Sequence, residues 1–199
     1  MLPKEFNLDN LDNGIRGLVI TLNRIPEINK KTTIYGPTSC EGHIGEYKNG
    51  NPYSTKDGWI FFYKPAKKRK DLIGRINQFC IEFPYFSISD REMEEFDFLR
   101  AGLNPDQTEK FSSYEIIGSF WSDTGYMDNF RFLEEDARLI EKARIRKKEL
   151  VSGWNELDSR IKDYIAKNIK KDIESLPYME EKNRTKGFVI PVCPRCMFQ

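Results

Sequence analysis

The stretch that decides the fold class is GWIFFYKPAKKRKDLIGRINQFCIEFPYFSIS, residues 58–89. Residues 59–64 (WIFFYK) are mostly aromatic or β-branched, which predicts a strand. Asp71 then precedes a stripe of apolar residues at helical spacing, which predicts a helix that begins at this aspartate. The members of that stripe are Leu72, Ile73, Ile76 and Phe79. Residues 83–89 (FPYFSIS) predict the next strand.

The segments on both sides extend this mixture of helices and strands. Towards the N-terminus, five apolar residues at helical spacing predict a helix that Asn10 or Asp12 caps and Pro26 ends. They are Ile15, Leu18, Val19, Leu22 and Ile25. Residues 32–35 predict a short strand, and residues 46–58 a polar excursion with turns at its Asn-Gly and Asp-Gly pairs. Further strands are expected at residues 94–102 and 113–121.

The last third of the chain has a different composition. From Asp128 to Ser175 there is no proline, one glycine and a continuing apolar stripe, which predicts two helices or one long helix bent near Ser152-Gly153. The apolar tail, residues 186–199, is expected to dock on the rest of the protein.

This order lacks a regular strand–helix–strand alternation, so we expect an α+β fold. The expected architecture is a mostly antiparallel sheet packed by an N-terminal helix and a second helix, followed by a long helical C-terminal region. Two parts follow from the change in composition: an α+β core at 1–127, and a helical region with its docked tail at 128–199.

Composition limits the function classes. The 199 residues include 32 basic and 31 acidic side chains, a net charge of +1, so no overall field favours nucleic acid. No apolar run is long enough to span a membrane, and the first residues lack the pattern of a signal peptide. A cytoplasmic location is therefore expected, where cysteines stay reduced or bind metal. Substrate, partner and oligomeric state stay open.

Two short motifs contain the only histidine and three of the four cysteines. CEGH at 40–43 and CPRC at 193–196 each place two ligand-type side chains three positions apart. Cys₃His is a usual ligand set for tetrahedral Zn²⁺, and four protein ligands make a site structural. We therefore predict that Cys40, His43, Cys193 and Cys196 bind one zinc ion that joins the 40–43 loop to the C-terminal tail.

Other interpretations of these residues stay open. The motifs lie about 150 residues apart, so they could bind metal separately or not at all. The C-terminal pair could be redox-active, although thioredoxin-like proteins place this motif at the start of a helix near a βαβ unit, and here it lies three residues from the end of the given sequence. Cys40 could be a nucleophile activated by His43. Cys80 is expected to be an ordinary buried thiol.

The loop also resembles a known family. Thr38, Ser39, Cys40, Gly42 and Ile44, followed by the tryptophan-bearing strand, are similar to the S-S-C-S-G-R-I loop of the wybutosine-synthesis tRNA methyltransferases. This resemblance implies an α/β fold with a pocket beside the loop and transfer from S-adenosylmethionine to RNA or a nucleotide.

In that interpretation Ser39, Glu41 and Gly42 would contact the substrate.

LNRIPEI at 22–28, followed by SCEGH at 39–43, also resembles uncharacterised bacterial and phage proteins with an S-C-x-G-H loop. That group implies no function. A metal-free binding module is the further alternative.

Two basic clusters could contact phosphate. One is residues 64–70, in which Lys67, Lys68, Arg69 and Lys70 are the candidate ligands, and the other is residues 144–148. Both are also typical of solvated surfaces, and we prefer that interpretation over binding of nucleic acid.

Overall fold

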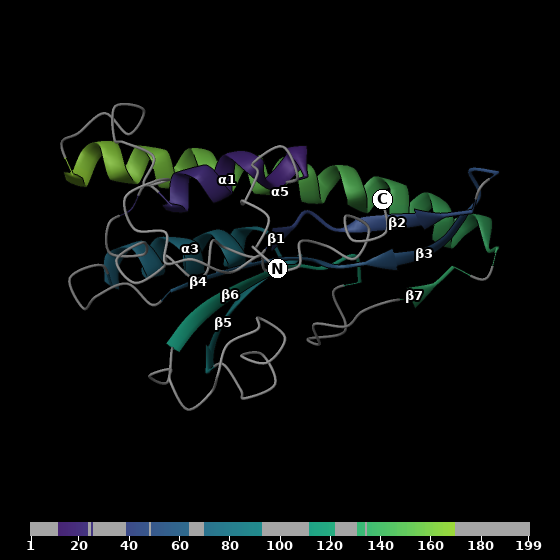
Figure 1. The fold of residues 1–199 in the computed structure, drawn as a ribbon, viewed down its shortest axis with the longest axis horizontal. Coiled ribbons are helices and arrows are strands. Elements are labelled where there is room, and N and C mark those ends of the chain that lie inside the picture. Colours follow the sequence, from purple (N-terminus) through teal and green to yellow (C-terminus); the bar gives the residue numbers. More distant parts are fainter. Residues whose placement is uncertain are drawn as a thin grey trace, which may run out of the picture.

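The computed structural model describes residues 12–23, 25, 39–47, 49–63, 70–92, 112–121, 131–133 and 135–169. Within these ranges the protein is a mixture of helices and antiparallel strands, as predicted (Figure 1). The helices are α1 (Asn13–Asn23), α3 (Lys70–Glu82) and α5 (Ala137–Ile169). None of these helices is long and apolar enough to cross a membrane.

The strands form two antiparallel sheets. The four-stranded sheet has the order β1-β4-β6-β5, made by β1 (Ser39–Cys40), β4 (Gly58–Tyr63), β6 (Ser112–Gly118) and β5 (Phe86–Glu92). The three-stranded sheet has the order β2-β3-β7, made by β2 (His43–Glu46), β3 (Pro52–Lys56) and β7 (Arg131–Phe132). Consecutive strands β1 and β2 therefore belong to different sheets.

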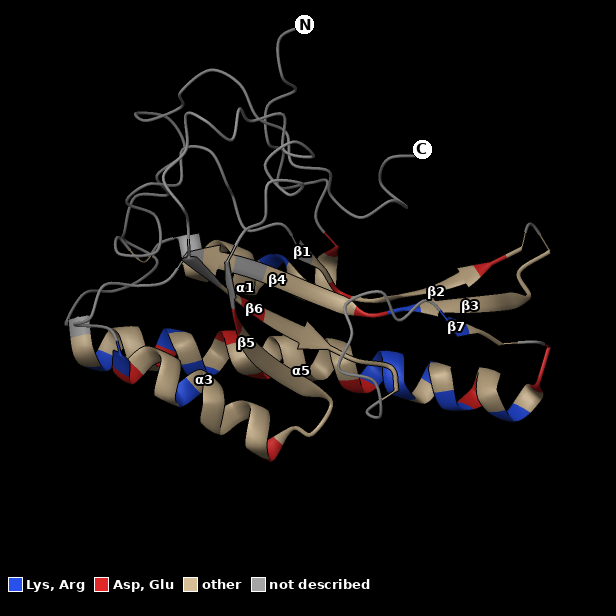
Figure 2. Cartoon of the chain, turned by 90° about the horizontal axis from the view of Figure 1, so that it is seen from below, with Lys and Arg blue, Asp and Glu red and all other residues tan. Residues whose placement is uncertain are grey.

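The long helix α5 runs along both sheets, with α1 and α3 beside it (Figures 1 and 2). The apolar stripe of α1 is buried as its spacing predicts, because Ile15, Leu18, Val19 and Leu22 are at most 1% exposed. A single hydrophobic cluster joins these residues to the sheets, to α3 and to α5, and so includes residues on both sides of position 127.

Gly153 lies within α5 and does not divide it. A Cβ atom at this position would lie 2.3 Å from the Phe86 ring, so the missing side chain leaves space for β5 against the helix. The neighbouring Trp154 is fully buried and meets Phe86 edge-on, with 4.6 Å between the ring centroids. The glycine that suggested a bend is explained by packing, and α5 continues for 33 residues.

Several sequence predictions are confirmed and others need correction. The strands expected at 59–64, 83–89 and 113–121 are β4, β5 and β6, and the helix expected from Asp71 is α3. The excursion at 46–58 has its Asn-Gly turn but also contains strand β3. The helix expected from Asp128 begins only at Ala137, because β7 precedes it. Predictions for 32–35, 94–102 and the tail lie outside the described residues.

Candidate metal centre

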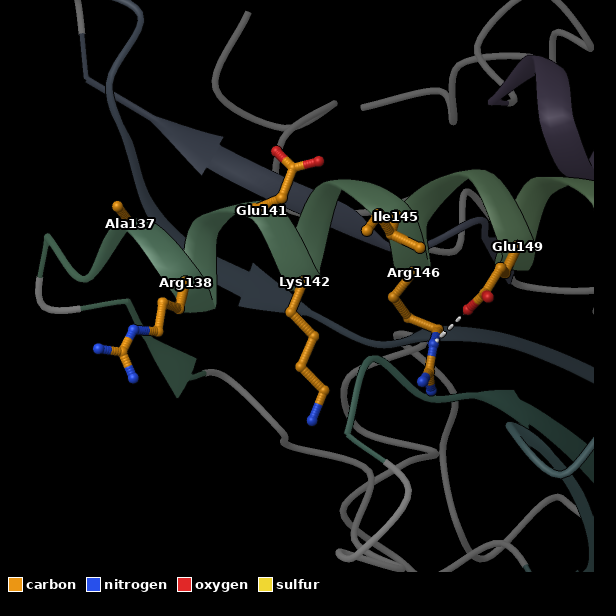
Figure 3. A pocket seen from close by; sticks show the side chains of 7 residues that line it. All are labelled: Ala137, Arg138, Glu141, Lys142, Ile145, Arg146 and Glu149. Atoms are coloured by element: carbon orange, nitrogen blue, oxygen red, sulfur yellow. Dashed lines mark hydrogen bonds and ion pairs between the residues drawn. The ribbon is translucent and has the colours of Figure 1, made fainter.

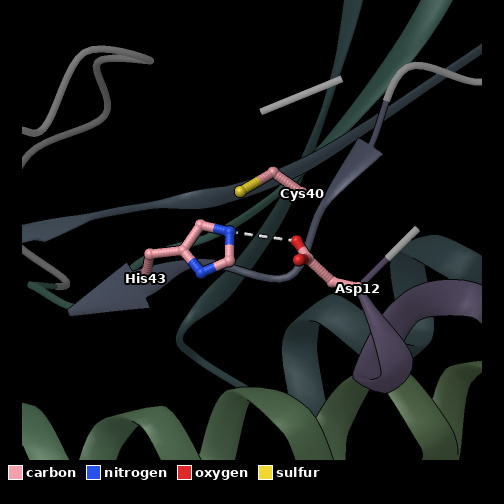
Figure 4. A group of neighbouring side chains, drawn as sticks. All are labelled: Asp12, Cys40 and His43. Carbon is pink, nitrogen blue, oxygen red and sulfur yellow. Dashed lines mark ion pairs between the residues drawn. The ribbon is translucent and has the colours of Figure 1, made fainter. Parts of the chain in front are cut away.

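Three metal-ligating side chains from separate elements converge at one end of α1. They are Asp12, which immediately precedes α1, Cys40 at the end of β1, and His43 at the start of β2 (Figure 4). One ligand atom from each lies within 4.8 Å of those of the other two. Among the described residues this is the only such group of three or more.

The approach of Cys40 to His43 follows from the two-residue link between β1 and β2. Cys40 pairs with Trp59 in the larger sheet, and His43 pairs with Lys56 in the smaller one. Gly42 has φ +89°, a left-handed conformation that glycine adopts without strain. A Cβ at Gly58 would lie 2.7–2.8 Å from backbone atoms of residues 40 and 41, so β4 can pass this closely only because residue 58 is glycine.

Asp12 reaches the site through the start of α1. Its carbonyl accepts hydrogen bonds from the N–H groups of Ile15 and Arg16. Its carboxylate accepts the Glu41 N–H at 3.2 Å and lies 3.0 Å from His43 Nε2. Asp12 therefore has the expected position before the helix, but its side chain binds the 41–43 loop.

Glu41 makes the complementary contact with the helix. Its Oε2 accepts the Gly14 N–H at 2.6 Å, so this glutamate satisfies an N–H group at the start of α1 that has no partner within the helix. Asp12 binds the loop backbone and Glu41 binds the helix backbone, in the manner of a capping box formed between two segments. This exchange fixes the distance between α1 and the loop that carries Cys40 and His43.

Helix α5 holds the same loop from a second direction. Lys147 Nζ donates to the Glu41 carboxylate and to the Gly42 carbonyl. Trp154 Nε1 donates to the Glu41 carbonyl at 3.2 Å. The loop backbone is therefore anchored by side chains that are distant in sequence and mostly buried.

The centre is shielded from solvent. Cys40 is fully buried and His43 is 8% exposed. Burial by itself raises the pKa of Asp12. The hydrogen bond and charge of His43 and the hydrogen bond from the Glu41 N–H lower this pKa by a larger amount, so the net pKa is below its ordinary value. The carboxylate is therefore ionised and able to bind a cation.

Orientation distinguishes ligand convergence from a catalytic relay. The Cys40 sulfur lies on the side of the imidazole ring that carries Nε2, the same nitrogen that faces Asp12 (Figure 4). A nucleophile–histidine–carboxylate triad uses opposite ring nitrogens for its two partners. The geometry therefore suits three donors around one ion better than the Cys-His dyad considered from the sequence.

The structure brings together Cys40 and His43 from the predicted zinc set, whereas Cys193 and Cys196 lie outside the described residues. Ser39 lies in β1, and Glu41 and Gly42 form the β1–β2 link. Lys70 is exposed at the start of α3, and Lys67, Lys68 and Arg69 are outside the described residues. Cys80 lies on α3, where burial raises its pKa to about 12.

Asp12 was missed as a candidate ligand. Its identity as a helix-capping residue was visible in the sequence, but no pattern connects it with a loop 29 residues away. Comparison with known proteins adds no further guide, since no family model, no curated protein and no solved structure matches the chain.

Proposed function

We propose that this chain is a zinc-binding protein, that Cys40 and His43 are ligands of the ion, and that Asp12 is a third ligand in one of two ligand sets. The observation that carries this proposal is the convergence of one oxygen, one sulfur and one nitrogen donor within 4.8 Å. Thiolate, imidazole and carboxylate are the three side-chain donors that Zn²⁺ takes in proteins. All three lie on elements fixed by a buried hydrogen-bond network, which favours a preformed site.

The required adjustment is small. With ordinary zinc bond lengths and tetrahedral angles, ligand atoms lie about 3.4–3.6 Å apart. Donors now up to 4.8 Å apart would approach by about 1 Å, and the 3.0 Å pair of His43 and Asp12 would open by about half an ångström. We expect side-chain rotation to supply changes of this size.

The fourth ligand is proposed to come from the C-terminal tail. In one ligand set, Cys193 or Cys196 completes a site that keeps Asp12. In the other ligand set, both tail thiolates bind the ion, and Asp12 is not a ligand but keeps its hydrogen bond with the Glu41 N–H. In both sets the ion has four protein ligands and a structural role, connecting the tail with α1 and the β1–β2 link.

Metal analysis tests the proposal directly. We expect one zinc per chain in the purified protein, and a loss of most zinc in Cys40→Ser and in His43→Ala. Cys80→Ser is the matched control, since it removes a thiol outside the centre and should keep the zinc. A wild-type protein without stoichiometric zinc, also after reconstitution with the metal, contradicts the proposal.

Cobalt substitution separates the two ligand sets. The intensity of the thiolate-to-Co²⁺ charge-transfer absorption counts bound thiolates. Two thiolates, together with weaker binding in Asp12→Asn, support the set that keeps Asp12. Three thiolates and unchanged binding in Asp12→Asn support the set predicted from the sequence. A single thiolate that Cys193→Ser and Cys196→Ser leave unchanged contradicts any tail ligand.

A further inference from the structure

A second cluster of charged residues lies at the other end of the same long helix, near β7. Arg138, Lys142 and Arg146 follow one another at four-residue spacing and extend from one face of α5 (Figure 3). They line an open cavity of about 540 Å³, whose wall also includes Ile145 and Glu149. Figure 2 shows basic residues along this end of the helix.

Arg146 is the most informative member of this row. It is only 8% exposed, and its Nε donates to Glu149 Oε2 at 2.7 Å. The guanidinium carbon lies 3.0 Å from the centroid of the Tyr85 ring. Its Nη1 is buried and has no hydrogen-bond partner among the described residues. A guanidinium is always charged, so a buried donor without a partner is costly, and an acceptor such as an anion in that position would remove the cost.

One more cation, Arg131, lies beside the row on an aromatic ring that it shares with Lys142. The Arg131 guanidinium lies 4.8 Å, and Lys142 Nζ 5.4 Å, from the centroid of the Trp121 ring. Among the described residues, no carboxylate forms an ion pair with Arg131, Arg138 or Lys142. Within the described part of the chain, the charges of these three residues are therefore not neutralised by an ion pair.

The position of these charges does not stabilise the helix. Arg138 lies in the first turn of α5, where the positive end of the helix dipole disfavours cations. Like charges four residues apart also repel one another. Asp136 partly offsets this arrangement because its carboxylate accepts the Arg138 N–H. A row of cations that opposes helix stability is explained if it binds an anion.

We propose that this row binds the phosphates of a single-stranded polynucleotide. Residues four apart on a helix are separated by about 6 Å along its axis, similar to the spacing of neighbouring phosphates on one strand. Lys142 and Arg138 would donate to neighbouring phosphates, and Arg146 Nη1, which is buried in this structure, would reach the next phosphate once its guanidinium turns towards the cavity.

The wall of this cavity contains three cations, Arg138, Lys142 and Arg146, and two carboxylates, Glu141 and Glu149. Its formal net charge is therefore +1, and Arg131 beside it adds to the positive charge of this region.

Fluorescence anisotropy with a short labelled oligouridylate tests the proposal. The test variant is Arg138→Gln with Lys142→Gln, and the matched control is Arg144→Gln with Lys148→Gln, which removes the same charge from exposed positions of the same helix. We expect the test variant to bind at least tenfold more weakly than the control variant. Its plot of log K against log salt should lose about 1.4 of its slope, since each phosphate contact on a single strand contributes about 0.7.

One further variant tests an individual contact. Arg146→Lys keeps the positive charge but removes the Nη1 donor, and it should bind more weakly than wild type. Circular dichroism establishes that each variant is folded before its affinity is compared.

The remaining outcomes overturn the proposal. They are a wild-type protein that does not bind the oligonucleotide, or equal losses in the test and control variants. Competition distinguishes the sources of phosphate. In one outcome, inorganic phosphate or vesicles with anionic headgroups bind through the same row and the oligonucleotide does not. That result would show an anion site that does not bind nucleic acid.

Discussion

Replacement of Glu41 by glutamine is the sharpest test of how the candidate metal centre is assembled. Glu41 connects α1 with α5, because its two oxygens accept the Gly14 N–H and the Lys147 ammonium. The substitution keeps the size of the side chain. Its amide oxygen can still accept from Gly14, so the main loss is the charge opposite Lys147.

The expected cost is about 2–3 kcal/mol of unfolding free energy. A hydrogen bond to a charged group contributes about 1.5–3 kcal/mol, and breaking a fully buried pair costs about 3–5 kcal/mol. The Lys147 and Glu41 side chains are 23% and 16% exposed, so the pair lies between these cases, nearer the first. Zinc affinity should fall about tenfold or more, as when other residues that position metal ligands are removed.

Urea unfolding of a double-mutant cycle with Lys147→Met measures this contribution. In the Lys147→Met background, Glu41→Gln should cost less than about 1 kcal/mol, because the ammonium that the glutamate neutralises is gone. The coupling energy between the two positions should then exceed about 1 kcal/mol. Additive effects of the two substitutions, or a loss below about 0.5 kcal/mol for Glu41→Gln alone, would refute the view that this ion pair holds the loop.

Three more outcomes follow from the structure. Gly58→Ala should cost about 2–4 kcal/mol in thermal unfolding, because its Cβ would overlap backbone atoms of residues 40 and 41; a stability change near zero contradicts that reasoning. Gly153→Ala should also destabilise, by about 1–3 kcal/mol, because contact with Phe86 outweighs the better helix propensity of alanine; a more stable variant refutes this packing. Cys80 should react with a disulfide reagent at pH 8 about 30- to 60-fold more slowly than a thiol of ordinary pKa. The rise of its pKa from 9.0 to about 12 leaves less thiolate, and the stronger nucleophilicity of that thiolate offsets part of the loss. Peptide mapping that finds Cys80 labelled as fast as a free thiol contradicts its burial.

Local patterns predicted much of the fold. The buried side chains of α1 and α3 recur at helical spacing, and β4 is a run of aromatic and β-branched residues, so each signal lies within a few neighbouring positions. Strand β3 was missed because Pro52–Lys56 contains proline, serine, threonine and lysine, and its strand conformation depends on pairing with β2 and β7. The start of the last helix was placed too early because Leu133 is buried without being helical.

The candidate centre was predicted only in part for a related reason. Cys40 and His43 share one short loop, so their proximity could be expected from the sequence. Asp12 comes near them through hydrogen bonds between α1 and the loop, and those bonds exist only once α1 has packed beside α5. Arg146 illustrates the same limit. Within 144–148 it looked like one of several exposed cations, and its burial against Tyr85 depends on the tertiary structure.

The same network determines what an ion would add to this protein. Asp12, Glu41 and Lys147 already hold α1, the loop and α5 together through protein contacts, and the hydrophobic cluster does not depend on the ligands. The described part of the chain therefore differs from small zinc domains that unfold without metal. Since the His43–Asp12 pair occupies the nitrogen that the proposed ion would take, the ion would have to displace that contact and any proton on the ring. The free energy of binding would then contribute mainly to fixing the proposed tail ligands, and only secondarily to the fold that presents Cys40 and His43.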